Sequence, residues 1–151
     1  FTLAIIWHKK QHYLAKISGP LKGAFTLYIS TTFIIFAIVL SPFHQPSGFE
    51  VFTNLILHYI TPIAFIIDWL LTEITIRYKW NYLMYWMIYP ISYIVFASIH
   101  GTFTGDYLYF FFDINVLGII GIVMFISILI IFGISLGSLY IWINRKRMIE
   151  R

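Results

Sequence analysis

The sequence predicts an all-α integral membrane protein, a polytopic bundle of helices that cross a lipid bilayer. Of its 151 residues, 60% are hydrophobic and 21% are aromatic, whereas only 11% are charged. A single soluble core of this size cannot bury so much apolar surface, so lipid must cover part of it. The apolar residues gather in four runs, each close to the roughly 20 residues that a membrane-spanning helix needs. The chain is therefore predicted to be one integral membrane domain over residues 1–151.

Short polar connectors separate the four predicted spans. The spans cover residues 24–40, 51–71, 80–100 and 116–143. Two turns that contain proline are expected to stop helices, Ser18-Gly19-Pro20 and Ser41-Pro42. Pro62 and Pro90 instead lie inside spans, where a proline frees a carbonyl of the preceding turn and usually kinks the helix.

The first seven residues, Phe1–Trp7, are apolar and run into the basic pair Lys9-Lys10. Seven helical residues reach only about 10 Å at 1.5 Å per residue, which is too short to cross a bilayer. We interpret this segment as the cytoplasmic end of an earlier helix, so that the sequence begins part-way through that helix.

The basic residues indicate how the spans are oriented. All ten lysine and arginine residues fall in alternate connectors: Lys9, Lys10, Lys16, Lys22, Arg77, Lys79, Arg145, Lys146, Arg147 and Arg151. The connectors between them, residues 41–50 and 101–115, carry acidic residues and no lysine or arginine. Because cytoplasmic connectors are enriched in basic residues, both ends of the chain are predicted to face the cytoplasm of a multi-pass protein of the cell membrane. The tryptophans at span ends beside the basic connectors agree: Trp7, Trp69, Trp80 and Trp142.

Composition also narrows the partners. The chain has no cysteine, which excludes a disulfide framework and a thiolate metal site. Its net charge of +4 comes from bases that topology requires, so the charge does not indicate nucleic-acid binding. Membrane lipids are the expected partners, no cofactor is indicated, and the oligomeric state is left open.

One ionisable residue lies well inside a span. His58 follows Asn54 by one helical turn and precedes Thr61 by another, so a regular helix places all three on one face. Counting from Glu50 puts His58 about 12 Å below the outer surface. Because an imidazole in hydrocarbon needs a partner or a water-filled cavity, His58 is the primary functional candidate. The alternative is a hydrogen bond that only stabilises helix packing, for instance to Tyr85.

Two further polar residues lie near span ends. Asp68 falls on approximately the same face as His58, near the cytoplasmic end, where pairing with Arg77 or Lys79 is the alternative to a functional role. His100 ends the third span at the outer boundary. A metal site that combined both histidines with an aspartate is geometrically conceivable. No histidine pair has the i, i+4 spacing of zinc-binding helices, so no metal is predicted.

Several motifs, taken in order, resemble those of one family. They are Asn54-x-x-x-His58-x-x-Thr61-Pro62, Asp68-Trp69, Tyr89-Pro90 and Gly105-Asp106-Tyr107-Leu108-Tyr109-x-Phe111-x-Asp113. The chain is similar to the bacterial branch of the androgen-induced-gene / FAR-17a-like integral membrane proteins. The resemblance implies a six-helix bundle with both termini cytoplasmic, of which this chain would hold four complete helices and the end of an earlier one. One departure is Phe110, where relatives usually have proline.

The resemblance implies a function as well. Animal members of the family are threonine hydrolases that cleave fatty acid esters of hydroxy fatty acids, using an intramembrane threonine and an intramembrane histidine. His58 matches the family histidine, which predicts an intramembrane hydrolase of lipid-like esters. Asn54, Thr61, His100 and Asp68 are then expected to support the site or to bind substrate. A lipid-binding protein without catalysis and, less favoured, a transporter remain as alternatives.

The nucleophile is harder to assign. Thr2 lies about 8 Å from the cytoplasmic boundary, whereas His58 lies near the outer third of the bilayer, so their levels differ by about 10 Å. A nucleophile and its base must come within about 3 Å. We therefore expect the family threonine to lie before Phe1.

Overall fold

The computed structural model describes residues 11–74 and 76–149, and the side chains of residues 19–74 and 76–149. Every regular element in this part of the chain is a helix. Four of these described helices are long and apolar enough to cross a membrane: Gly19–Phe43, Phe49–Thr72, Tyr82–Thr104 and Ile114–Arg147. They confirm the predicted all-α membrane fold and lie close to the predicted spans. The interpretation of Phe1–Trp7, including Thr2, concerns residues outside the described ones.

The chain divides into two compact units, each described by itself. The first unit contains the residues up to Lys79 together with those from Leu139 onward. The second unit is Trp80–Ser138.

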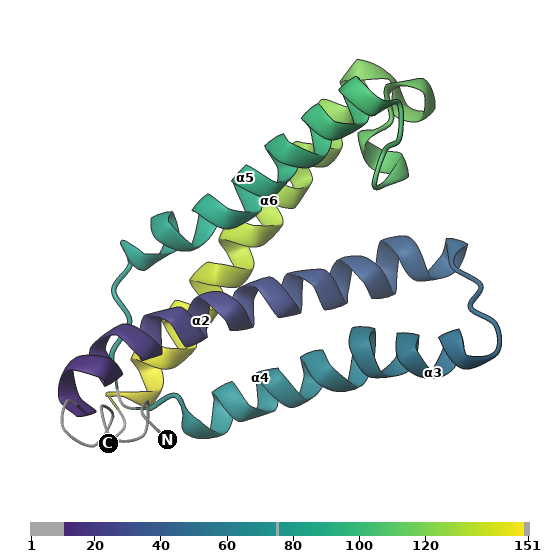
Figure 1. The fold of residues 1–151 in the computed structure, drawn as a ribbon. Coiled ribbons are helices and arrows are strands. Elements are labelled where there is room, and N and C mark those ends of the chain that lie inside the picture. Colours follow the sequence, from purple (N-terminus) through teal and green to yellow (C-terminus); the bar gives the residue numbers. More distant parts are fainter. Residues whose placement is uncertain (1–10, 75, 150–151) are drawn as a thin grey trace. The chain divides into compact units, whose positions relative to one another are not determined.

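A long helical hairpin forms most of the first unit (Figure 1). Its first arm is the α-helix α2 (Gln11–Ile35), followed by the π-helix η1 (Phe36–Leu40) and the 3-10 turn η2 (Ser41–Phe43). Its second arm is α3 (Phe49–Leu55), the π-helix η3 (Ile56–Ile60) and α4 (Thr61–Thr72). The two arms run antiparallel, and α2 packs against both η3 and α4.

One of the two predicted helix stops is wrong and the other is confirmed. Helix α2 continues through Pro20, although a proline removes one helical hydrogen bond. Packing outweighs that local cost: Gly19 is buried so closely that an added Cβ would lie 2.8 Å from Glu73 Oε1 and 3.4 Å from Ile76. Ser41-Pro42 does end its helix, because the backbone becomes extended at His44.

The second unit pairs α5 (Tyr82–Thr104) with most of α6 (Ile114–Arg147), which run side by side in Figure 1. The helices approach closely where Gly133 faces the side chain of Met87. Between them, the 3-10 turn η4 (Phe110–Phe112) places the ring of Phe111 flat on that of Phe125, with centroids 4.4 Å apart. This aromatic contact fastens the connector to the helix that follows it.

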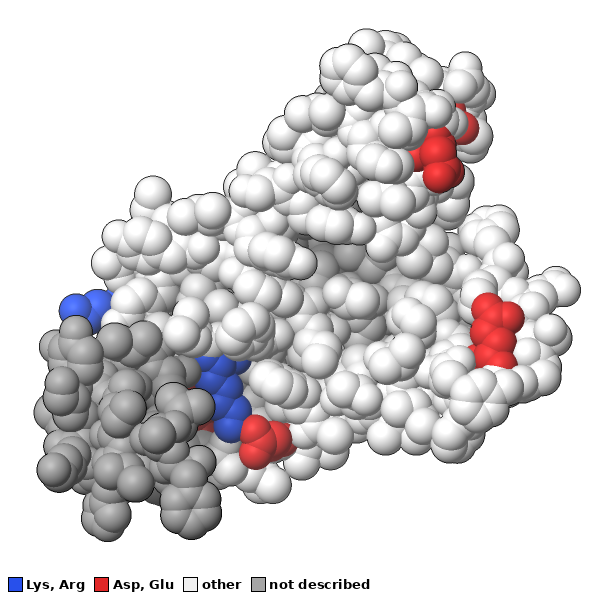
Figure 2. Space-filling view, viewed as in Figure 1, with Lys and Arg blue, Asp and Glu red and all other residues white. Residues whose placement is uncertain are grey.

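Large apolar side chains remain exposed along the helices, for example Ile38 at 70%, Met84 at 75% and Ile120 at 74%. A soluble protein does not leave so many such side chains in contact with water. On the face seen in Figure 2, red and blue atoms gather toward helix ends, and uncharged surface covers the stretches between them. The exposed surface is therefore suited to lipid.

Candidate functional site

His58 lies in the π-helix η3 of the hairpin, directly against the first arm. Its ring stacks on that of Phe36 in η1, with centroids 3.8 Å apart and an interplanar angle of 18°. Phe36 is only 7% exposed, so the stack belongs to the interior of the hairpin. Since Phe36 covers one face of the imidazole, the ring nitrogens remain for hydrogen bonds in the plane of the ring.

Two polar atoms on this helix are buried without a hydrogen-bond partner among the described residues. One is Nδ1 of His58, and the other is Oδ1 of Asn54, one turn earlier in α3. Membrane interiors contain no bulk water that would satisfy such atoms, so each costs free energy until it finds a partner. The two residues that the sequence predicts to share one helix face therefore each have a buried atom that lacks a hydrogen bond.

Both arms change from α- to π-helical spacing at the level of this stack. The N–H of Ser41 bonds to the carbonyl of Phe36, and the N–H of Thr61 bonds to that of Ile56, each five residues back instead of four. In each arm the next residue is a proline, which has no N–H and whose ring crowds the carbonyl four residues earlier. The wider turn relieves this crowding. Single π turns of this kind occur frequently at functional sites.

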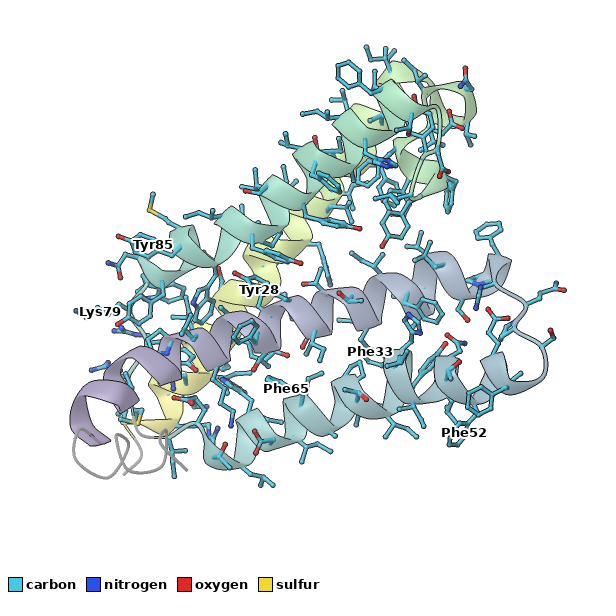
Figure 3. All side chains as sticks on the ribbon, viewed as in Figure 1. Tyr28, Phe33, Phe52, Phe65, Lys79 and Tyr85 are labelled. Atoms are coloured by element: carbon cyan, nitrogen blue, oxygen red, sulfur yellow. The ribbon has the colours of Figure 1, made fainter. Side chains whose placement is uncertain are left out.

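Two further aromatic rings contact Phe36. The Phe36 ring meets the rings of His44 and Tyr59 edge-on, with centroids 6.0 Å and 5.9 Å away. Tyr59 donates a hydrogen bond of 3.3 Å to Ser41 Oγ, which joins the two proline turns across the hairpin. Figure 3 shows Phe33 lying between the two arms, whereas Phe52, which is 56% exposed, points away from the hairpin.

The structure places the other predicted site residues elsewhere. Thr61 begins α4 and is exposed, because the π turn changes the register that would have put it on the face of His58. Asp68 is also exposed and forms an ion pair with Lys22 Nζ at 2.5 Å, in place of the expected Arg77 or Lys79. His100 belongs to the second unit, where its Nδ1 lies 3.1 Å from the carbonyl oxygen of Asp106.

Sequence reasoning missed the contacts that join the turn of His58 to the first arm. Phe36, Tyr59 and Ser41 are ordinary membrane residues by composition, and nothing in their spacing alone marks them. A usable signal was present in the two hydroxyl–proline pairs, Ser41-Pro42 and Thr61-Pro62. Each one ends a π turn, and the Phe36–His58 stack and the Tyr59–Ser41 hydrogen bond join these turns across the hairpin.

A second cluster of buried polar groups centres on Tyr78, at the end of the first unit opposite the His58 stack. The hydroxyl of Tyr78 accepts a hydrogen bond from Trp69 Nε1 and donates one to the carbonyl of Gly19, each 3.0 Å long. The backbone N–H of Tyr78 donates to Asn144 Oδ1, and Arg145 donates to the Tyr78 carbonyl. Burial raises the pKa of the Tyr78 phenol, and the Trp69 hydrogen bond partly offsets the rise. These four hydrogen bonds satisfy the polar groups of Tyr78, which indicates a structural role.

Within residues 11–74 and 76–149, no group of three histidine, aspartate or glutamate side chains is placed to hold a metal ion. Asn54 and His58 contribute hydrogen-bonding groups to the site. His58 offers Nδ1 as a donor or an acceptor depending on its tautomer.

Comparisons with family models, with curated proteins and with solved structures give no match. The family resemblance thus stays a prediction from the motifs of the sequence.

Proposed function

We propose that this protein is a multi-pass membrane protein that binds a lipid-like ester, with the polar group of the ester held by Asn54 and His58. The observation that carries the proposal is the pair of buried, unpartnered atoms, Asn54 Oδ1 and His58 Nδ1, inside a helical hairpin suited to lipid. A ligand that meets both atoms would recover the free energy that their burial costs. The acyl chain would lie along apolar surface that the helices already expose.

Hydrolysis of the bound ester is the second candidate, favoured by the match of Asn54-x-x-x-His58-x-x-Thr61-Pro62 to the family motif. In that reaction His58 takes a proton from a threonine hydroxyl while the hydroxyl oxygen attacks the ester carbonyl. His58 then returns the proton to the departing alcohol, which leaves the acyl group on the threonine, and Asn54 orients the ring or donates to the oxyanion. A water molecule that gives its proton to His58 then attacks the acyl-threonine, which releases the fatty acid and restores the threonine hydroxyl. No hydroxyl of the described residues is hydrogen-bonded to His58, so the nucleophile would come from outside them.

We also propose that the basic end of the first unit faces the cytoplasm. This end gathers Lys22, Arg77, Lys79 and Arg145, since the bonds of Tyr78 bring the ends of α2, α4 and α6 together. Under the positive-inside rule, the connector with His44 and Glu50 then faces the outside.

The test uses the purified full-length protein in nanodiscs with a panel of fluorescent acyl esters. Wild type should bind at least one ester, and His58→Ala and Asn54→Ala should each weaken binding about tenfold, as expected for a lost buried hydrogen bond. Thr53→Ala and Ile60→Ala change the neighbouring residues and should leave binding intact.

Release of fatty acid is followed in the same samples. Turnover that disappears in His58→Ala supports hydrolysis, and binding without turnover leaves the protein a lipid binder. If His58→Ala and Asn54→Ala bind every ester as tightly as wild type does, the proposed site is wrong.

A further inference from the structure

We propose that the lipid bound at this site carries a free hydroxyl on its polar group, as a monoacylglycerol does. The inference rests on the proposed function, because it concerns the ligand of the same site. It narrows the ligand from lipid-like esters in general to those whose head group donates a hydrogen bond.

The side-chain atoms of the site set the first requirement. Asn54 Oδ1 is an acceptor, so its partner must be a donor. His58 Nδ1 is a donor in one tautomer and an acceptor in the other. A hydroxyl group donates one hydrogen bond and accepts others, so a single hydroxyl satisfies both atoms when His58 Nδ1 carries the proton. In the other tautomer both atoms accept, and the two hydroxyls of a monoacylglycerol supply the two donors.

Backbone carbonyls beside His58 also lack hydrogen-bond donors. In an α-helix the N–H of Thr61 would bond to the carbonyl of Leu57. Here it bonds to the carbonyl of Ile56 instead, so the Leu57 carbonyl loses this donor. Pro62 has no N–H to give to the carbonyl of His58. The carbonyls of Leu57 and His58 therefore each lack the N–H donor that an α-helix would give them. The turn thus has more hydrogen-bond acceptors than donors.

Other lipid head groups fit this balance less well. An ester carbonyl only accepts hydrogen bonds, so it can meet His58 but leaves Asn54 Oδ1 without a donor. An ionised carboxylate also only accepts, and it adds the cost of placing a charge in hydrocarbon. Because Phe36 covers one face of the His58 ring, a hydroxyl must reach Nδ1 in the plane of the ring.

Native mass spectrometry of the full-length protein, released from detergent, measures the binding of two probes. One is monooleoylglycerol, and the other is its dimethyl ether, which keeps the ester and the chain but lacks both donors. Monooleoylglycerol should bind at least about tenfold more tightly, the usual effect of one buried hydrogen bond. Asn54→Ala should bring its affinity down to that of the ether, whereas Thr53→Ala should preserve the difference.

The outcomes separate the two proposals. Equal affinity for both probes, with both weakened by His58→Ala, overturns the hydroxyl requirement and keeps lipid binding at the site. Binding of neither probe overturns this inference, and the fluorescent esters then decide independently whether any lipid is bound. A preference for monooleoylglycerol that survives in Asn54→Ala shows that the hydroxyl is recognised elsewhere and contradicts the inference.

Discussion

Glu73 shows what a single buried carboxylate does in this fold. It follows the last residue of α4 and is 5% exposed, and its Oε1 has no hydrogen-bond partner among the described residues. Desolvation raises the pKa of Glu73 above its ordinary value of 4.5, while the charge of Lys22 works against the rise. Folding therefore favours the protonated form.

The raised pKa of Glu73 makes the stability of the folded chain depend on pH. Since the pKa of Glu73 is higher in the folded than in the unfolded chain, its contribution to stability is complete below the unfolded value. The contribution is lost as the pH rises through the raised folded value. Glu73→Gln keeps the shape without the charge, so it should melt higher than wild type at pH 7 and depend less on pH. Melting in detergent, followed by tryptophan fluorescence, measures the difference.

Glu50→Gln is the control, because this glutamate lies at the other end of the hairpin and is exposed. The variant should keep the pH dependence of wild type. A Glu73→Gln variant that melts lower than wild type at pH 7 would show that the buried carboxylate is needed in its charged form.

The sequence draws attention to single polar residues in apolar surroundings, but it does not identify the residues that contact them. His58 and Asn54 stand out because hydrocarbon tolerates such groups poorly. Phe36 does not stand out, because a phenylalanine in an apolar run could face lipid or protein equally well. Its role depends on the pairing of two helices, which a single sequence does not specify.

At the scale of elements, the two π turns determine how the hairpin presents His58. A regular α-helix would have placed Asn54, His58 and Thr61 on one face. The π turn keeps the first two buried at their polar atoms and leaves Thr61 exposed. The apolar runs predicted the four membrane-spanning stretches closely, but not the start of α2 before Pro20. A change of helical spacing inside a run was not predictable either. The prolines indicated that the helix is disturbed locally, but they did not specify the geometry of the turn.

Pro62→Ala tests the origin of this turn. The new residue supplies an N–H to the carbonyl of His58, so η3 should return toward α-helical spacing and rotate the imidazole off Phe36. Ester binding should fall about tenfold or more, while the variant melts no lower than wild type because proline is costly inside a helix. Binding assays and the ring-current shift of the His58 protons measure both effects.

Pro90→Ala provides the matched control, because Pro90 lies inside α5 of the second unit. Its effect on ester binding should be small. If Pro62→Ala retains both the ring-current shift and the affinity, proline is not the cause of the π turn.

At the scale of the molecule, the alternation of charge along the sequence reappears in the first unit. The basic connectors meet at one end through Tyr78, and the acidic connector lies at the other end of the hairpin. The sequence predicted this separation because every second connector is basic. It did not predict the hydrogen bonds of Tyr78, since contacts between Gly19, Tyr78 and Asn144 join segments far apart in the chain.

Single cysteines test the predicted orientation, because residues 1–151 contain no cysteine. Ser47→Cys lies in the acidic connector and Lys79→Cys in a basic one, and both positions are exposed. In intact cells, a membrane-impermeant maleimide should label the first and should label the second only after permeabilisation. The opposite pattern would invert the proposed topology, and equal labelling of both would mean that the hairpin does not cross the membrane.

The bonds between the two ends of the chain also constrain how the protein is made. Ser30 and Tyr140 share a hydrogen bond of 2.6 Å across 110 positions, and Tyr78 depends on Asn144 for its backbone N–H. The first hairpin therefore leaves the ribosome long before the residues that complete its packing are translated. Until α6 is inserted, the hydroxyl of Ser30 and the amide of Tyr78 lack these partners. A nascent chain stalled before Leu139 would thus expose buried polar groups by which quality-control proteases can recognise it as unfinished.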